Sequence, residues 1–260
     1  MALSPDYRSY SGVSRGGDAA AVLDAGLRAH MLRVYNWMTS GLMLTGIVAY
    51  GIANVPAIFE LFYVTTRIPG RGLILQPTVL GFVAMIAPLG FVLVLSFGVN
   101  RLSKTAVQAL FWAFCVAMGA SLTNILIVYT GQSITQVFFV TAGTFAAMSL
   151  YGYTTRADLT KLGGFLIMGL IGIIIAGLVN IFIGSSALAF AITVIGVFIF
   201  VGLTAYDTQR IKSDYVEFAY AYGPDEAAKR SVFDSLSLLL NFINLFMLLL
   251  QLIGVRNNNN

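Results

Sequence analysis

A polar face runs along the last apolar stretch of the chain, about residues 233–253. Its members recur every three or four residues, the spacing of one face of a helix: Asp234, Ser237, Asn241, Asn244, Leu248 and Gln251. At 1.5 Å per residue this face extends about 25 Å, most of the thickness of a membrane. Because polar side chains are costly against lipid, the face points inward. Two interpretations stay open: a hydrogen-bonded seam between helices, or the wall of a water-accessible ion path.

An acid, Asp207, stands at the end of the preceding apolar run. The dipole of a helix disfavours an acid at its C-terminus, so the carboxylate needs a basic partner. Arg210 and Lys212 follow within the same helical segment, and Arg101 lies at the same side of the membrane. The sequence therefore predicts an ion pair at Asp207 and leaves open which of these cations forms it.

The elements that carry these residues must cross a membrane. The 260 residues are 58% hydrophobic and only 10% charged, whereas a soluble domain is about 25% charged. A bilayer requires roughly 20 apolar residues in each helix. Seven runs approach that length, so we expect an all-α integral membrane protein with spans at about 37–55, 77–99, 107–130, 134–153, 162–183, 187–206 and 233–253.

Positive charge predicts the orientation of these spans. Of the 15 Lys and Arg, only Arg67, Arg71 and Arg256 fall on the alternate side of the membrane. Since Lys and Arg collect in cytoplasmic loops, the N-terminus is predicted in the cytoplasm and the C-terminus outside. The basic charge balance therefore indicates a lipid partner, the bilayer, and argues against nucleic acid.

Three regions follow from this arrangement. Residues 1–32 are predicted to form a cytoplasmic tail, partly an amphipathic helix that lies on the membrane surface with Leu23, Leu27 and Met31 on one face. Residues 33–254 form the seven-helix membrane domain, and residues 255–260 a polar C-terminal tail. The longest polar loop, about residues 208–229, is expected in the cytoplasm.

The fifth predicted span carries a stripe of small or polar residues. The stripe recurs every four residues, at Gly172, Ala176, Asn180 and Gly184. Small residues let a neighbouring helix approach closely, so the stripe predicts a packing contact.

The sequence argues against an enzyme. One cysteine, Cys115, and one histidine, His30, exclude a disulfide and a Cys/His metal cluster. A rhomboid-type protease needs Ser and His within its spans, an intramembrane aspartyl protease needs a Gly-x-Gly-Asp segment, and a retinal protein needs a lysine in its last span. None of these is present, so we expect no enzyme activity and no cofactor.

Several segments resemble the Bax inhibitor-1 family of bacterial type, over about residues 33–254. They are Tyr206-Asp207, Gln209-x-Ile211-Lys212, Leu236-Ser237-Leu238 and Asn241-Phe242-Ile243-Asn244-Leu245-Phe246. The resemblance implies a seven-helix protein of the bacterial inner (plasma) membrane, with the last helix surrounded by the other six. It also implies a pH-sensitive calcium leak, in which two acids on the last two helices share a proton and an arginine latches the closed form.

Carried over to this sequence, the first acid is Asp207 and the arginine is Arg101. The second acid falls on Asn241, whose amide does not titrate, so we expect a weaker pH response. Asp234, seven residues earlier on the same face, is the possible secondary acid. Asp207 and Asn241 would be weak calcium ligands, calcium would be the permeant ion, and the expected cavity lining is Thr204, Ser237, Asn244 and Gln251.

A second function stays open beside the leak. The family is also linked to stress survival, so the alternative is a non-transporting stress-response regulator that binds membrane proteases or other membrane proteins.

Overall fold

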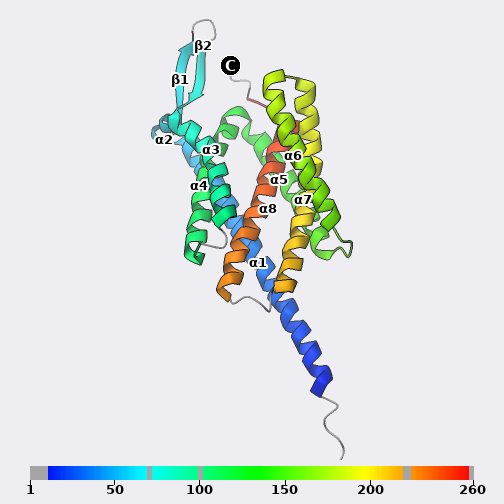
Figure 1. Ribbon diagram of the computed structural model, residues 1–260. Coiled ribbons are helices and arrows are strands. Elements are labelled where there is room, and N and C mark those ends of the chain that lie inside the picture. Colours follow the sequence, from blue (N-terminus) through cyan, green and yellow to red (C-terminus); the bar gives the residue numbers. More distant parts are fainter. Residues whose placement is uncertain (1–10, 69–71, 99–101, 219–223, 258–260) are drawn as a thin grey trace, which may run out of the picture.

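Helices lying side by side make up most of this computed structural model, which describes residues 11–68, 72–98, 102–218 and 224–257 (Figure 1). The helices are α1 (Ser11–Asn54), α2 (Pro56–Phe62), α3 (Val79–Gly98), α4 (Lys104–Val128), α5 (Gly131–Thr154), α6 (Thr160–Ile183), α7 (Ser186–Phe218) and α8 (Pro224–Ile253). Strands β1 (Tyr63–Ile68) and β2 (Gly72–Pro77) pair antiparallel as a hairpin.

The helices confirm the predicted membrane fold. Within the described residues, α3 to α8 are each long and apolar enough to span a membrane. The seventh candidate is α1 taken together with α2, a pair bent by 97° at Val55. Helices α3 to α6 agree with their predicted spans to within a few residues, whereas α1, α7 and α8 extend beyond theirs.

Helix α8 lies in the interior of the bundle. It packs against α7, α1, α5 and α4, and it is the most buried of the six single-helix spans. The main buried cluster also includes Leu95 of α3, and a second cluster joins Leu166 of α6 to Leu245 of α8. Helix α6 is the least buried span, and its main neighbour is α7.

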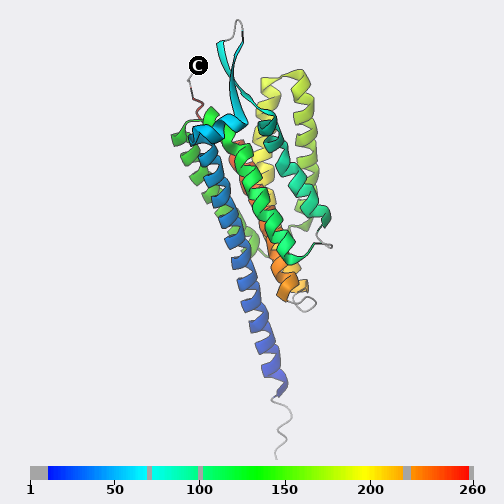
Figure 2. The same cartoon turned by 90° about the vertical axis from the view of Figure 1, so that its left-hand side faces the viewer.

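The helix predicted in the N-terminal tail is present, and it is continuous with the first span. Figure 2 shows α1 as one long helix that enters the bundle without a break and extends beyond its neighbours. Leu27 and Met31 are buried against the bundle, and Val34 and Met38 continue the same stripe. Since this stripe has no interruption, the helix packs along α4 and α8. Residues 1–10 of the predicted tail lie outside the described residues.

The predicted cytoplasmic loop at about residues 208–229 is also mostly helical. Helix α7 continues to Phe218, and α8 begins at Pro224, where proline suits the first turn of a helix. Arg230 donates to Asp214 at 2.7 Å and joins these two extensions. Residues 219–223 lie outside the described residues.

The loop between the first two predicted spans contains α2 and the β1–β2 hairpin, which the hydropathy pattern did not predict. The hydroxyl of Thr78 donates to the carbonyl of Leu61 at 2.6 Å and closes the base of the hairpin. The hairpin projects from the end of the bundle opposite to the start of α1 (Figure 1).

The small-residue stripe of α6 does not form the predicted helix contact. A Cβ atom on Gly172 would meet no atom within 4 Å. Helix α6 instead meets α7 where Gly163 faces the Tyr206 ring and Leu166 faces Gly202. Asn180 helps to close the turn, because its side chain accepts from Ser185 N beside Gly184, which has φ 67°.

Candidate functional site

The buried acid of α7 has two partners. Asp207 is 8% exposed, and its Oδ2 accepts from the amide Nδ2 of Asn241 on α8 at 2.7 Å. Its Oδ1 lies 3.0 Å from Nη2 of Arg210, three residues further along α7. Because a buried carboxylate needs a counter-charge and hydrogen-bond donors, these two contacts allow it to stay ionised inside the bundle.

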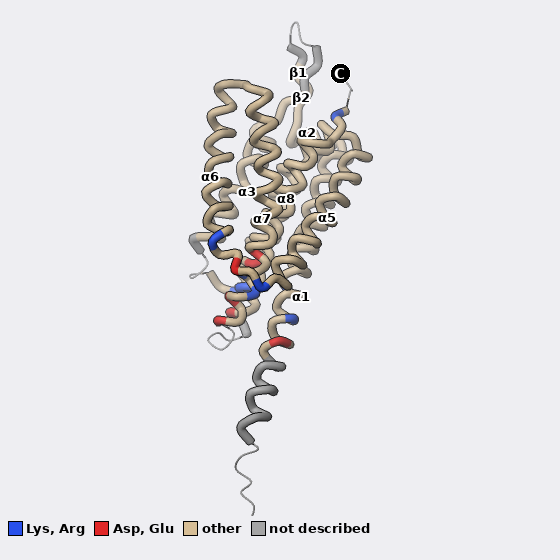
Figure 3. The backbone as a smooth tube through the Cα atoms, turned by 90° about the vertical axis from the view of Figure 1, so that its right-hand side faces the viewer, with Lys and Arg blue, Asp and Glu red and all other residues tan. Residues whose placement is uncertain are grey.

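Of the candidate cations that the structure describes, Arg210 and Lys212, it is Arg210 that pairs with Asp207. Lys212 points elsewhere: its Nζ donates to the carbonyl of Tyr153 at 2.8 Å and lies 5.1 Å from the centre of the Tyr153 ring. Arg101, the latch implied by the family resemblance, lies outside the described residues. Figure 3 shows that the described charges gather at this end of the helices.

Where the family resemblance implies a second acid that shares a proton with Asp207, Asn241 donates an amide hydrogen instead. In an acid pair, one carboxyl group donates its proton to the other, and that donor disappears when both acids ionise. The Asn241 amide donates at every pH, so its bond to Asp207 does not depend on a proton. The site can therefore titrate at Asp207 while keeping a donor from α8.

Of the two expected calcium ligands, Asp207 is occupied by donors in this state. Both oxygens of Asp207 are engaged, one by Arg210 and one by Asn241. The part of the chain that the structure describes contains no group of three His, Cys, Asp or Glu side chains arranged to hold a metal ion. For Asp207 to contact a cation, Arg210 must first move away.

The polar face of α8 lies along α7 in this state. Ser237 accepts from Nη2 of Arg210 at 3.3 Å, and Gln251 accepts from the Thr193 hydroxyl at 3.4 Å. Asn244 is half-buried between these levels, and Thr204 of α7 is buried with its hydroxyl bonded to its own helix. Ser237 and Gln251 thus form hydrogen bonds between the two helices.

A second set of hydrogen bonds fixes α7 at the level of Asp207. The hydroxyls of Tyr35, Ser149 and Thr208 are linked in a row, which joins α1, α5 and α7. The side chain of Gln209 accepts from Leu159 N and donates to Ala157 O, both at 2.8 Å. Residues 207–209 therefore each contact a different part of the bundle.

Asp234 does not join the Asp207 and Asn241 pair. Its Oδ2 lies 3.0 Å from Nε2 of His30, a buried side chain of α1. The sequence reasoning used His30 only to exclude metal and protease chemistry. The signal was present, because His30 lies on the helical face of Leu27 and Val34, which the structure buries.

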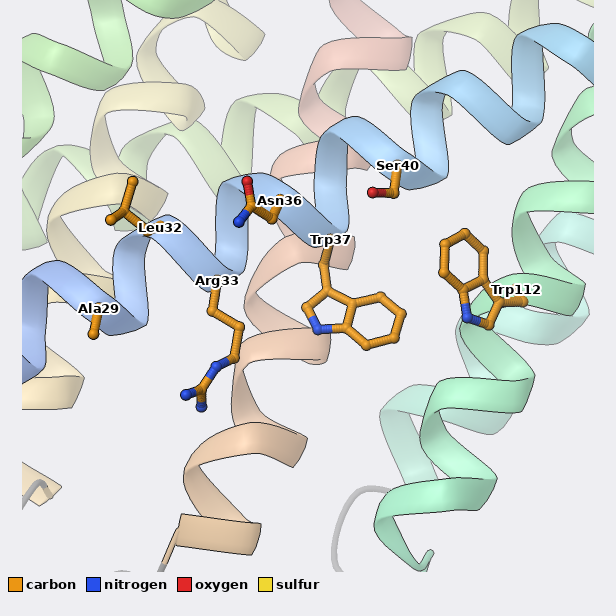
Figure 4. Close-up of a pocket in the computed structure, with 7 residues that line it drawn as sticks. All are labelled: Ala29, Leu32, Arg33, Asn36, Trp37, Ser40 and Trp112. Carbon is orange, nitrogen blue, oxygen red and sulfur yellow. The ribbon is translucent and has the colours of Figure 1, made fainter.

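Cavities flank α1 among the described residues. One is about 510 Å³ and is lined by Arg33, Asn36 and Ser40 beside Trp37 and Trp112, whose rings are 5.3 Å apart (Figure 4). A mainly apolar cavity of about 530 Å³ lies between α1, α5 and α8, and another of about 500 Å³ is also lined by α4. Asp207 and Asn241 line none of these cavities, so their site has no opening into them.

The sequence is similar to several bacterial proteins. Residues 27–258 match the profile of a protein family described as "Inhibitor of apoptosis-promoting Bax1". The chain is 46% identical to inner membrane protein YbhL of Escherichia coli, over 89% of this chain and 94% of that protein. It is 45% identical to a protein of Caulobacter vibrioides, over 89% and 90% of the two chains, and 43% identical to a protein of Rickettsia prowazekii, over 90% and 93%.

Proposed function

Because the chain belongs to the Bax inhibitor-1 family of membrane proteins, we propose that it is a passive, pH-modulated leak channel for calcium and related cations, gated by Asp207. Its place is a bacterial inner membrane, with the N-terminus in the cytoplasm. The observation that carries the proposal is the carboxylate of Asp207, buried between α7 and α8 and held by Arg210 and Asn241. Buried ionisable groups in membrane proteins are typical of ion paths and proton relays.

The gate works through the charge of Asp207. The ionised carboxylate attracts Arg210 and keeps the α7–α8 seam together. Protonation removes that attraction and leaves the guanidinium without its counter-charge, so Arg210 turns toward water and the seam loosens. Flux through the bundle then rises as the pH falls through the range in which Asp207 takes up its proton.

Calcium flux into liposomes containing the purified protein tests this gate. In Asp207→Asn the amide resembles the protonated acid, so flux is high at neutral pH and the rise in flux that protonation of Asp207 produces is lost. Asp214→Asn is the matched control, because Asp214 lies two turns further along α7 and pairs with Arg230 outside the site. If Asp207→Asn leaves flux and its pH dependence unchanged, the assignment of the gate is wrong.

The identity of the latch is tested by a second pair of variants. Arg210→Gln removes the cation that contacts Asp207, and Arg101→Gln removes the one implied by the family. We expect Arg210→Gln to raise flux at neutral pH more than Arg101→Gln does. If Arg101→Gln raises flux more than Arg210→Gln in the same liposome assay, Arg101 is the latch.

The alternative, a regulator without transport that binds membrane proteases or other membrane proteins, is supported by one feature. Helix α1 extends beyond the neighbouring helices and offers a surface to a partner (Figures 1 and 2). Cross-linking in native membranes tests it. A stoichiometric partner that is lost when residues 1–26 are deleted, with no calcium flux from the intact protein, favours the regulator.

A further inference from the structure

A histidine and an acid are buried together at the contact of α1 with α8. Nε2 of His30 lies 3.0 Å from Oδ2 of Asp234, and the two residues are 204 positions apart in the chain. His30 is 4% exposed and Asp234 7%. The other ring nitrogen of His30, Nδ1, is buried without a hydrogen-bond partner. The pair is thus a tertiary contact in which Nδ1 of His30 has no hydrogen-bond partner.

Helix α7 completes the surroundings of the imidazole. The ring of Tyr215 stacks on it, with centroids 4.9 Å apart and planes inclined by 28°. Gly26 leaves room for this tyrosine, because a Cβ atom at position 26 would collide with the Tyr215 hydroxyl. An aromatic face within about 6 Å of a cation attracts it, and the Tyr215 ring lies within that distance of the imidazole.

The charge of the pair changes by one when His30 takes a proton. With a neutral imidazole, Nε2–H donates to Asp234 and the site holds one buried negative charge. A proton added at Nδ1 turns this bond into an ion pair with no net charge, and charge-assisted bonds are roughly twice as strong as neutral ones. Imidazole is the side chain that ordinarily changes charge between about pH 5 and 8.

Other charged groups near this end have partners of their own. On α7, Asp207 pairs with Arg210 and Asp214 with Arg230, and on α8 Lys229 lies 3.7 Å from Glu226. The negative charges of Asp234 and Asp207 also act on each other.

The remaining helices add few charges around the pair. Lys104 is the sole charged residue of α4, and α5 has none. On α1 the nearby charged residues Asp24, Arg28 and Arg33 are exposed. Among the described residues, Asp234 is thus the group that the structure places in direct contact with the His30 nitrogen.

We propose that His30 and Asp234 form a proton-binding site that ties α1 to α8 when the proton is bound. The amide of Asn241 cannot provide a second titrating group, and this pair provides one on the same polar face. Its link to ion flux rests on the proposed function. Protonation of His30 strengthens the α1–α8 contact and restrains the bundle, whereas protonation of Asp207 loosens the α7–α8 seam.

Proton binding is tested by NMR on the full chain in lipid nanodiscs. Because the sequence has a single histidine, one ¹³C-labelled imidazole resonance reports on His30. We expect this resonance to shift as His30 takes up its proton, and the curve of Asp234→Asn to be displaced to lower pH because the imidazolium has lost its counter-charge. Asp24→Asn, which removes an exposed acid of α1, leaves the curve in place.

Two results would overturn the site: a resonance that does not move with pH, or identical curves for Asp234→Asn and Asp24→Asn. If Asp234→Asn does not fold, Tyr215→Leu replaces it, since loss of the aromatic face displaces the curve in the same direction. An unmoved curve in that variant also counts against the proposal.

Calcium flux tests the link to the channel. In the wild type we expect protonation of His30 to produce a fall in flux, opposed by the rise that protonation of Asp207 produces. His30→Gln keeps a donor for Asp234 without a titrating ring, so this fall is lost and the rise remains. The same flux profile in His30→Gln and wild type refutes the link. Absence of flux in the wild type refutes the proposed function, while the NMR result still decides the proton site.

Discussion

Asp207 is stabilised by two contacts of different kinds. Arg210 supplies the opposite charge from within α7, and Asn241 supplies an N–H donor from α8. Only the second contact crosses between helices and depends directly on how they pack. Arg210 also donates to Ser237 of α8, so the guanidinium links Asp207 to α8 across the same seam. The chemistry of this site therefore depends on one pair of helices.

Replacing Asn241 with aspartate tests the role of the amide. Asn241→Asp exchanges the permanent donor for an acid that must share a proton with Asp207, since two adjacent carboxylates do not both ionise readily. We expect a steeper pH dependence of calcium flux than in the wild type, measured in liposomes. An unchanged pH profile in a folded Asn241→Asp protein would mean that the donor to Asp207 has no part in gating.

Removing the Arg210 guanidinium lowers stability. Arg210→Gln leaves a buried carboxylate with a single donor, and we expect a loss of about 1 kcal/mol or more, seen as a lower melting temperature in detergent. The arginine side chain is itself 39% exposed, so solvent reduces this cost. Arg33→Gln is the control, because Arg33 is an exposed residue of α1. Equal melting temperatures for the two variants would contradict the ion pair.

Part of this site could be predicted from the sequence. Asp207 and Asn241 were predicted to share a site because their motifs resemble those of a known family, and the structure joins them at 2.7 Å. Helical spacing favours Arg210, three residues after Asp207, over Lys212, five residues after it, because only the first lies on the face of Asp207. His30 was missed as a partner because the sequence shows which face it lies on and not which helix covers that face.

At the scale of elements, close helix contacts set the position of α7. Gly152 of α5 lies against the backbone of Ala205, and Gly163 of α6 lies against the ring of Tyr206. These contacts flank Asp207 directly. Because glycine has no side chain, the neighbouring helices approach α7 closely enough for the Ser149 and Thr208 hydroxyls to bond at 3.0 Å.

A methyl group at position 152 disturbs this contact. In Gly152→Ala the new Cβ would collide with the carbonyl oxygen of Ala205, and we expect a loss of about 1–3 kcal/mol from overpacking. Gly143→Ala is the control in the same helix, because a Cβ there meets no atom within 4 Å. Thermal unfolding in detergent compares them. Equal stability of the two variants would show that α5 and α7 lie further apart.

At the scale of the whole molecule, most of the described charge lies at one end of the bundle and the C-terminus lies at the other. Most of the described charges gather at one end of the helices (Figure 3), and the exceptions are Glu60 of α2 and Arg256 near the C-terminus. Asn257 donates to the carbonyl of Val128 at 2.9 Å, which fixes the last described residue against the junction of α4 and α5. Since positive charge favours the cytoplasm, the site end is predicted to face it.

Cysteine labelling tests this orientation. In a Cys115→Ala background, which removes the single native cysteine, we introduce Arg256→Cys or Ala25→Cys, both at exposed positions. A membrane-impermeant maleimide added to spheroplasts should label position 256 directly and position 25 only after permeabilisation. The opposite pattern would reverse the topology and place the Asp207 site outside the cytoplasm.

The sequence by itself determined where the chain crosses the membrane, which face of α8 is polar and which acid is buried in α7. These features depend on local hydrophobic length and on helical periodicity, both of which are properties of consecutive residues. Only the tertiary structure decided that α1 continues through the tail into the bundle and that α7 and α8 extend beyond their apolar runs. It also decided that Asp234 of α8 pairs with His30 of α1. The reason is physical: a buried charge takes whichever partner the packing of distant helices brings within reach, and separation along the chain carries no record of that distance.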